Sequence, residues 1–209
     1  MNPRLLIVTG VVAALAFVAL LTGYATRGDD PSGGRDATAE GVSGEQTGLR
    51  GARIAHGVPA PDFKLHDENG KTFSMRDLRG KPVVVTFLYS TCRDTCPATA
   101  QQIRGALDQL GHDVPAVAIS VDPKGDTPES ARRFLAEQNM TGRMRWALGS
   151  RAELERLWTA YGTTPQTVQE EHMARAVLID AQGRQRVGFP MNETSPDMIA
   201  HDLAVIGGR

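Results

Sequence analysis

The sequence predicts an α/β domain, and three observations carry that prediction. Short apolar runs alternate with segments whose apolar residues recur at helical spacing, which is typical of a sheet with helices packed on it. The run over residues 83–89 is β-branched and aromatic without alternating polarity, as in a strand buried on both faces. A hairpin pattern and a final helix follow residue 174. With 209 residues and 41% hydrophobic content, the chain can bury one core of ordinary size.

The expected elements follow one another from residue 62 to residue 206. A short hairpin is expected over residues 62–74, because Glu68-Asn69-Gly70 supplies its turn. After the strand 83–89, a helix is expected with Pro97 in its first turn, since proline lacks an N–H, and Gly111 is its stop signal. The other expected elements are strand 116–121, a helix opening at Thr127-Pro128, strand 144–148, a helix capped by Ser150 and Glu153, strands 174–179 and 186–189, and a helix over 195–206.

This order of elements matches a thioredoxin-like fold best, elaborated by an N-terminal hairpin. In that fold, reactive cysteines lie on the first turn from strand to helix, at the carboxyl ends of the strands. The only cysteines of the chain, Cys92 and Cys96, fall on this turn. We expect them at or just before a helix N-terminus, where unpaired N–H groups and the helix dipole favour thiolates.

Two cysteines at this spacing allow three kinds of chemistry. Cys92 and Cys96 could close a structural disulfide, cycle between dithiol and disulfide, or hold a soft metal ion. Two thiolates suit Cu(I), whereas a closed structural zinc site needs four protein ligands. The spacing alone leaves these alternatives open.

Composition excludes one class of partner. The net charge is -1 and the aromatic content is 5%, so the chain has neither the basic surface nor the stacking platform of a nucleic-acid binder. Two cysteines are also too few for a scaffold built on disulfides.

The N-terminal region reads as a targeting segment followed by a linker. Residues 1–25 contain an uncharged apolar run, 5–21, that predicts a single-pass membrane anchor. Cleavage near Gly23-Tyr24-Ala25 is the alternative and would release a secreted protein. Residues 26–51 are polar and rich in glycine, so we predict a flexible linker. The folded domain is then 52–209, on the extracytoplasmic side of the cell membrane.

Several motifs together resemble the SCO/SenC family of membrane-tethered copper proteins. The resemblance covers roughly residues 58–206, and its motifs are specific only in combination. The matching residues are Asp62-Phe63, Arg79-Gly80-Lys81, the run from Cys92 to Pro97, Val121-Asp122-Pro123, Asp126-Thr127-Pro128, His172, Leu178-Ile179-Asp180 and Gly183.

The resemblance implies a thioredoxin-like fold in which Cys92, Cys96 and His172 bind copper. It also implies a role in assembling the binuclear copper site of cytochrome c oxidase, by delivering copper to its copper-bearing subunit or by reducing that subunit's cysteines. Arg93 is a departure, because the family commonly has proline there, and Glu170-Glu171 before the histidine is another. Neither departure removes a ligand, but Arg93 could favour the Cys92 thiolate and so shift the balance toward thiol–disulfide redox chemistry.

A separate argument supports His172. Redox proteins of thioredoxin-like fold usually place a cis-proline directly before the strand that passes the cysteine pair. Between Gln166 and Phe189 this chain has no proline, and the segment before the strand offers His172 instead. An exposed loop histidine is the plainer alternative.

The sequence therefore leaves several functions open, and with them whether the protein is an enzyme. A copper metallochaperone is the first hypothesis. The second is a thiol–disulfide oxidoreductase in which Cys92 attacks a partner disulfide and Cys96 resolves the mixed disulfide. A thiol peroxidase is disfavoured, because neither cysteine follows the expected proline and threonine. The last alternative is an interaction module with a structural disulfide.

Overall fold

The computed structural model describes residues 48–163 and 174–208 and has the α/β architecture that the sequence predicts. Its strands are β1 (Ala52–Arg53), β2 (Lys64–His66), β3 (Thr72–Ser74), β4 (Val83–Leu88), β5 (Ala116–Ser120), β6 (Met144–Ala147), β7 (Arg175–Ile179) and β8 (Gln185–Pro190). Its α-helices are α2 (Thr95–Leu110), α3 (Pro128–Glu137), α4 (Arg151–Ala160) and α5 (Pro196–Ile206). Short 3-10 helices cover Ala55–Gly57, Met75–Leu78 and Met191–Glu193.

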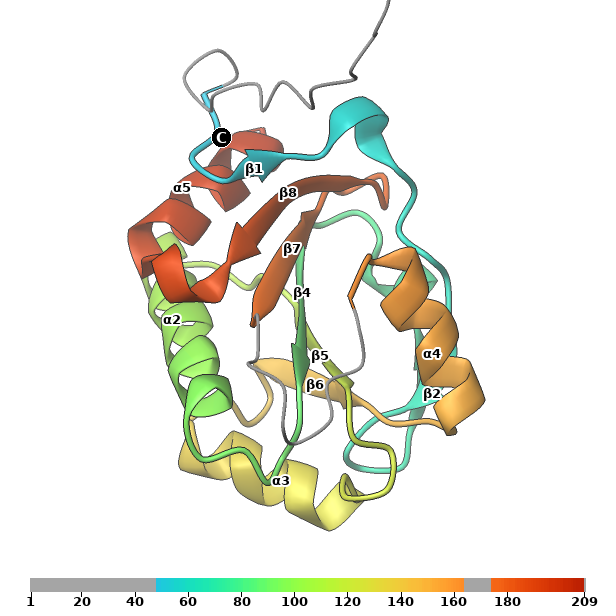
Figure 1. Ribbon diagram of the computed structural model, residues 1–209. Coiled ribbons are helices and arrows are strands. Elements are labelled where there is room, and N and C mark those ends of the chain that lie inside the picture. Colours follow the sequence, from blue (N-terminus) through green and yellow to red (C-terminus); the bar gives the residue numbers. More distant parts are fainter. Residues whose placement is uncertain (1–47, 164–173, 209) are drawn as a thin grey trace, which may run out of the picture. The chain divides into compact units, whose positions relative to one another are not determined.

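The strands form a six-stranded sheet in the order β1-β8-β7-β4-β5-β6, and β2 and β3 form the separate hairpin expected over residues 62–74 (Figure 1). Strand β4 lies at the centre and is buried at every position. It runs parallel to β5 but antiparallel to β7, so the sheet is mixed. The lack of alternating polarity in β4 follows from cover on both faces.

Two apolar layers cover the sheet. On one face, Val84 and Leu88 pack with side chains of α2, α3 and α5, among them Ile103, Phe134 and Leu203. On the other face, the hairpin and α4 pack over Val85 and Phe87 and bring in Trp158. Figure 1 shows α2 and α5 on one side of the sheet and α4 with β2 on the other.

The topology gathers several chain segments at one edge of the sheet. The strands β4, β5 and β6 are parallel, so their carboxyl ends meet at this edge. The cysteine turn follows β4 there, and the loop 121–127 follows β5. Because β7 is antiparallel to β4 and pairs Ala176 with Thr86, it begins at the same edge with Arg175.

The folded domain begins before residue 52, because residues 49–51 of the expected linker 26–51 already pack against it. Leu49 is only 6% exposed. The backbone N–H groups of Arg50 and Gly51 donate to the carboxylate of Asp202 at 2.8 and 2.9 Å, and β1 pairs with β8. Asp202 on α5 is fully buried, and His201 Nδ1 lies 2.9 Å from its Oδ1. A single buried carboxylate therefore fixes the start of the domain.

We expect Asp202→Ala to lower the free energy of unfolding by about 2–4 kcal/mol, because it removes charge-assisted hydrogen bonds and leaves two N–H donors unpaired. Asp202→Asn keeps an acceptor oxygen and is the matched control with a smaller loss. Urea denaturation measures the loss, and amide exchange at Arg50 and Gly51 locates it. Equal stability of Asp202→Ala and the wild type would contradict this account of the domain start.

The membrane anchor at 1–25 and the linker up to residue 47 lie outside the described residues. Among the residues that the structure does describe, none of the helices has the length and apolar character needed to cross a membrane.

Candidate metal centre

The two cysteines are held by the turn between β4 and α2, as the sequence predicts. The N–H of Cys92 donates to the carbonyl of Tyr89 at 3.2 Å, which closes the turn before the helix. Helix α2 begins at Thr95, so Cys96 and Pro97 lie in its first turn and Cys92 lies just before it. Gly111 ends the helix in a left-handed conformation with φ 65°.

The sulfur of Cys92 lies over the open N-terminus of α2. It accepts a hydrogen bond from the backbone N–H of Cys96 at 3.3 Å and lies 3.6 Å from the Thr95 hydroxyl. Both cysteines are free thiols and nearly buried, with 7% of Cys92 and 4% of Cys96 exposed. The N–H groups that have no partner within the helix therefore stabilise a negative sulfur at Cys92.

The pKa values of the two thiols are driven apart. At Cys92, burial opposes ionisation, but hydrogen bonds from the Cys96 thiol and from the backbone N–H groups of Asp94 and Cys96 outweigh it and lower the pKa below 9.0. At Cys96, burial raises the pKa strongly, and the neighbouring Cys92 sulfur raises it further. The pair is therefore asymmetric, because Cys92 loses its proton more readily than Cys96.

Tyr89 completes the immediate surroundings of the sulfurs, a role that the sequence analysis did not assign. Burial is the main cause that raises the pKa of Tyr89, and a hydrogen bond with Cys92 is the next. The phenol therefore stays protonated beside Cys92. Its position three residues before Cys92 is the signal that could have identified it.

A buried carboxylate ties the cysteine turn to the loop after β5. Asp126 is 8% exposed and accepts hydrogen bonds from Ser90 N at 2.7 Å, Ser90 Oγ at 2.6 Å and Ser120 Oγ at 2.6 Å. The Ser90 hydroxyl also lies 2.8 Å from Ser130 Oγ, in the first turn of α3. Burial raises the pKa of Asp126, although the serine hydrogen bonds oppose this. Asp126 therefore connects the loop after β5 to Ser90 in the cysteine turn.

We expect Asp126→Ala to destabilise the domain by about 2–3 kcal/mol, because the N–H of Ser90 loses a buried charged acceptor. Asp126→Asn, which resembles the protonated acid, loses less. Since burial raises the pKa of Asp126, the protonated form of its carboxyl favours the folded state at low pH, and that contribution is lost as pH rises through the raised pKa. The stability of the wild type relative to Asp126→Asn should therefore fall with rising pH; a rise would contradict the assignment.

The third expected ligand, His172, lies outside the described residues, as do Glu170 and Glu171. Of the other histidines, His66 lies on β2 and His201 pairs with Asp202 on α5. His112 follows α2 and lies roughly 20 Å from Cys96, given the rise of about 1.5 Å per helical residue. Within residues 48–163 and 174–208, His, Cys, Asp and Glu side chains nowhere gather in a group of three that could hold a metal ion.

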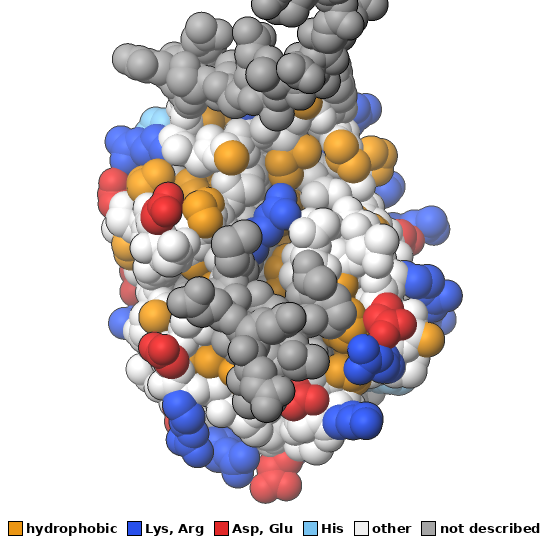
Figure 2. All heavy atoms as spheres, viewed as in Figure 1, with side chains coloured by type: hydrophobic (Ala, Val, Ile, Leu, Met, Phe, Trp, Pro, Cys, Tyr) orange, Lys and Arg blue, Asp and Glu red, His pale blue; other side chains and the backbone are white. Residues whose placement is uncertain are grey.

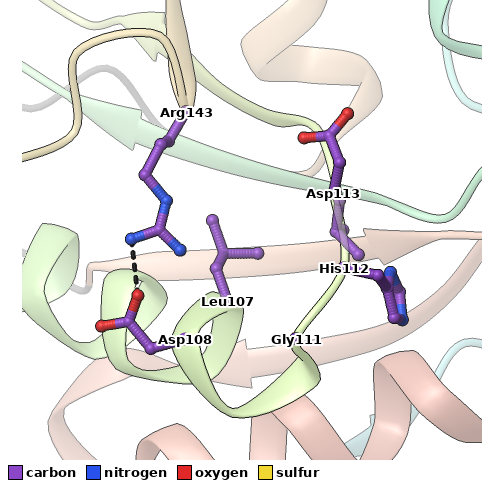
Figure 3. A pocket seen from close by; sticks show the side chains of 7 residues that line it. Leu107, Asp108, Gly111, His112, Asp113 and Arg143 are labelled. Atoms are coloured by element: carbon purple, nitrogen blue, oxygen red, sulfur yellow. Dashed lines mark hydrogen bonds and ion pairs between the residues drawn. The ribbon is translucent and has the colours of Figure 1, made fainter.

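A pocket lies at the C-terminal end of α2, away from the cysteines (Figure 3). It has a volume of about 390 Å³ and is lined by Leu107, His112 and charged side chains. Arg143 in its wall pairs with Asp108 at 2.6 Å, and Asp113 pairs with Lys81 at 3.2 Å. Each of its charged side chains thus already has an ion-pair partner, and no cysteine is among the described residues that line it.

The fold and the site together define a class: a thioredoxin-like α/β protein with an asymmetric pair of thiols at the N-terminus of the helix that follows its central strand. Residues 54–206 match the SCO1/SenC family. The chain belongs to this family.

Named relatives agree with this assignment. Protein SenC of Rhodobacter capsulatus is 31% identical over 152 residues, which cover 68% of this chain and 67% of SenC. The solved structure of Bradyrhizobium japonicum ScoI with copper bound has 30% identity, covers 71% of this chain and 99% of ScoI, and superposes with a TM-score of 0.60. BsSco, from a family of cytochrome c oxidase assembly proteins and the subject of a disulfide-switch study, has 21% identity, covers 73% of this chain and 95% of its own, with a TM-score of 0.65, and shares the fold.

The extent of the matches varies. The chain spans 37–38% of the length of the SCO2-like proteins of Rickettsia that it matches.

Proposed function

We propose that this protein is an exported copper-binding metallochaperone that helps assemble the binuclear copper site of cytochrome c oxidase. Its cargo would be bound by Cys92, Cys96 and His172. The observation that carries the proposal is the pair of thiols at the N-terminus of α2, where the N–H of Cys96 stabilises the Cys92 sulfur. The copper in the related ScoI structure and the family resemblance support the choice of metal and of recipient.

The donor set fits a soft, low-coordinate ion. Cu(I) prefers thiolate ligands, and two thiolates with one imidazole form a suitable low-coordinate ligand set. A closed zinc site would need four protein ligands. A ligand set of two sulfurs and one nitrogen leaves room for a recipient's sulfur to approach, so transfer can proceed by ligand exchange.

The position of β7 supports His172 as the third ligand. Arg175 begins β7 at the edge of the sheet where the cysteine turn lies. His172 precedes Arg175 by three residues, and a three-residue segment reaches at most about 10 Å. This connectivity supports His172 as a candidate third ligand.

The location of the domain is part of the proposal. The apolar run at residues 5–21 would anchor the chain in the cell membrane, or act as a cleaved signal, and the domain would lie on the extracytoplasmic side. Residues 26–47 would then tether the domain to that anchor.

Copper binding to the reduced full chain, kept in a neutral detergent, tests the proposal. We expect one Cu(I) per wild-type chain. His172→Ala should bind at least about tenfold more weakly, a loss of about 1.4 kcal/mol, while His112→Ala at the far end of α2 should bind like the wild type. Equal affinity of the two histidine variants would remove His172 from the site.

Thiol–disulfide exchange with a partner protein is the second candidate, and the asymmetry of the two thiols favours it. Cys92, with its lowered pKa, would attack a partner disulfide, and Cys96 would resolve the mixed disulfide. Cys96→Ser should then trap a covalent complex with the copper-bearing oxidase subunit, while Cys92→Ser should trap none. If Cys96→Ser traps no complex while the wild type binds copper normally, the oxidoreductase function is excluded and only the metallochaperone function remains.

A further inference from the structure

A small groove opens beside Cys92, between the cysteine turn and α3. We call it the cysteine groove; its walls include Ser90, Cys92, Arg93, Pro97, Arg133 and Phe134. Its volume is about 240 Å³. That is below the roughly 300–1,000 Å³ of common small-molecule pockets, so the groove can receive a few side chains of a partner but cannot enclose a drug-sized ligand.

The walls of the cysteine groove are held in place by contacts between helices. Gln101 on α2 donates from Nε2 to the backbone carbonyl and the side-chain oxygen of Gln138, at 3.1 and 3.0 Å. Phe134 is 2% exposed and packs edge-on against Trp146, with ring centroids 5.2 Å apart. The groove is therefore preformed, and a partner can enter it without first ordering it.

Two arginines give the groove its charge. Arg93 and Arg133 are both exposed, and within the described part of the chain neither guanidinium has a hydrogen-bond or ion-pair partner. Glu137 also lines the groove, so two cations and one anion leave a net charge of +1 while Cys92 is uncharged, as it is in the disulfide form. Six arginines of the domain differ from these two, because each pairs with a carboxylate: Arg50, Arg76, Arg104, Arg143, Arg151 and Arg186.

The surface view agrees with this arrangement. In Figure 2, Lys and Arg side chains lie at the lower left beside acidic side chains at the bottom, and Figure 1 places α3 along this lower end of the molecule. Arginine side chains that have no carboxylate partner within the described part of the domain attract an anionic partner and raise its rate of encounter.

We propose that the cysteine groove is the docking site for a short acidic segment of the thiol-bearing partner protein, which places the partner's sulfur against Cys92. The inference rests on the proposed function only in requiring a partner that exchanges copper or thiols with this chain. Arg93 and Arg133 would hold carboxylates of the segment, and Pro97 with Phe134 would contact its apolar parts.

A thiol exchange reaction tests the docking without copper. The full chain is oxidised to the Cys92–Cys96 disulfide and mixed with a peptide that carries two cysteines. A peptide thiolate attacks the sulfur of Cys92, the disulfide bond breaks, and Cys96 leaves as a thiolate that takes up a proton. The second peptide thiolate then attacks the peptide's own sulfur in the mixed disulfide, and Cys92 leaves as a thiolate, so the products are an oxidised peptide and the reduced protein.

Three peptides of equal length, with the cysteines flanked by Glu, Gln or Lys, separate charge from reactivity. Each rate is divided by the rate of the same peptide with a small neutral disulfide, which corrects for the peptide's own thiol. At low ionic strength we expect the Glu peptide to react at least about tenfold faster than the Lys peptide, and salt should reduce this ratio.

The variants place the effect in the groove. Arg133 lies on α3 rather than beside the sulfurs. Arg133→Glu should lower the ratio of the Glu-peptide rate to the Lys-peptide rate to about one or below. The double variant Arg93→Glu with Arg133→Glu should invert this ratio. Arg156→Glu, an exposed arginine on α4, is the matched control for net charge and should keep the wild-type ratio. An equal ratio in Arg133→Glu and Arg156→Glu would overturn the proposal. Copper binding is measured in parallel, so that loss of the metal site and loss of docking are told apart.

Discussion

Replacing either cysteine by serine is expected to weaken Cu(I) binding by at least about a thousandfold, which corresponds to about 4 kcal/mol. A serine hydroxyl stays protonated at neutral pH and is a hard donor, so it cannot replace a thiolate on a soft ion. At Cys92 the substitution also removes the sulfur that the Cys96 N–H stabilises. Competition with a chromogenic Cu(I) chelator measures the affinity of the full chain.

The fold should survive both substitutions, because serine is close to cysteine in size and can accept the same hydrogen bond. A control variant that keeps both thiols makes this checkable: Thr91→Ser, on the exposed residue before Cys92, should bind copper like the wild type. Thermal unfolding followed by circular dichroism should be cooperative in all three variants. Affinities within tenfold of the wild type in both Cys92→Ser and Cys96→Ser would contradict the proposed site.

The second large effect concerns the reactivity of the two thiols. We expect iodoacetamide to modify Cys92 at least about a hundredfold faster than Cys96 at pH 7, because only the thiolate reacts and the pKa values are shifted in opposite directions. The rate at Cys92 should fall as pH drops through its lowered pKa, below 9.0. The rate at Cys96 should stay low throughout this range.

Single-cysteine chains separate the two rates. Cys96→Ser reports on Cys92 and Cys92→Ser on Cys96, with mass spectrometry to assign the modified residue in the wild type. The Cys96 thiol is one source of the lowered pKa at Cys92, so the wild type should titrate lower than Cys96→Ser. Equal rates at both cysteines, or a faster Cys96, would show that the N-terminus of α2 does not control their ionisation.

Local signals were enough to predict most of the fold. The run Val83–Leu88, Pro97 and Gly111 place β4 and α2, and the Thr127 and Ser150 capping boxes place the starts of α3 and α4. These features act within one or two turns of chain, so the sequence carries them directly.

Contacts between distant segments could not be predicted in this way. The backbone of Arg50 meets Asp202 across 152 residues, and Ser90 meets Asp126 across 36, and neither pair has a sequence pattern. The cysteine groove likewise needs α3 packed beside the cysteine turn before Arg93 and Arg133 share a wall. The sequence identifies the two sulfurs of the site, while their surroundings depend on tertiary packing.

The ligand set of bound Cu(I) tests the central claim most directly, and X-ray absorption spectroscopy of the copper-loaded, reduced full chain measures it. We expect two sulfur ligands and one nitrogen ligand in the wild type. His172→Ala should lose the nitrogen while keeping both sulfurs, and His112→Ala should keep all three ligands. A nitrogen that persists in His172→Ala, or a wild-type site with fewer than two sulfurs, would contradict the account.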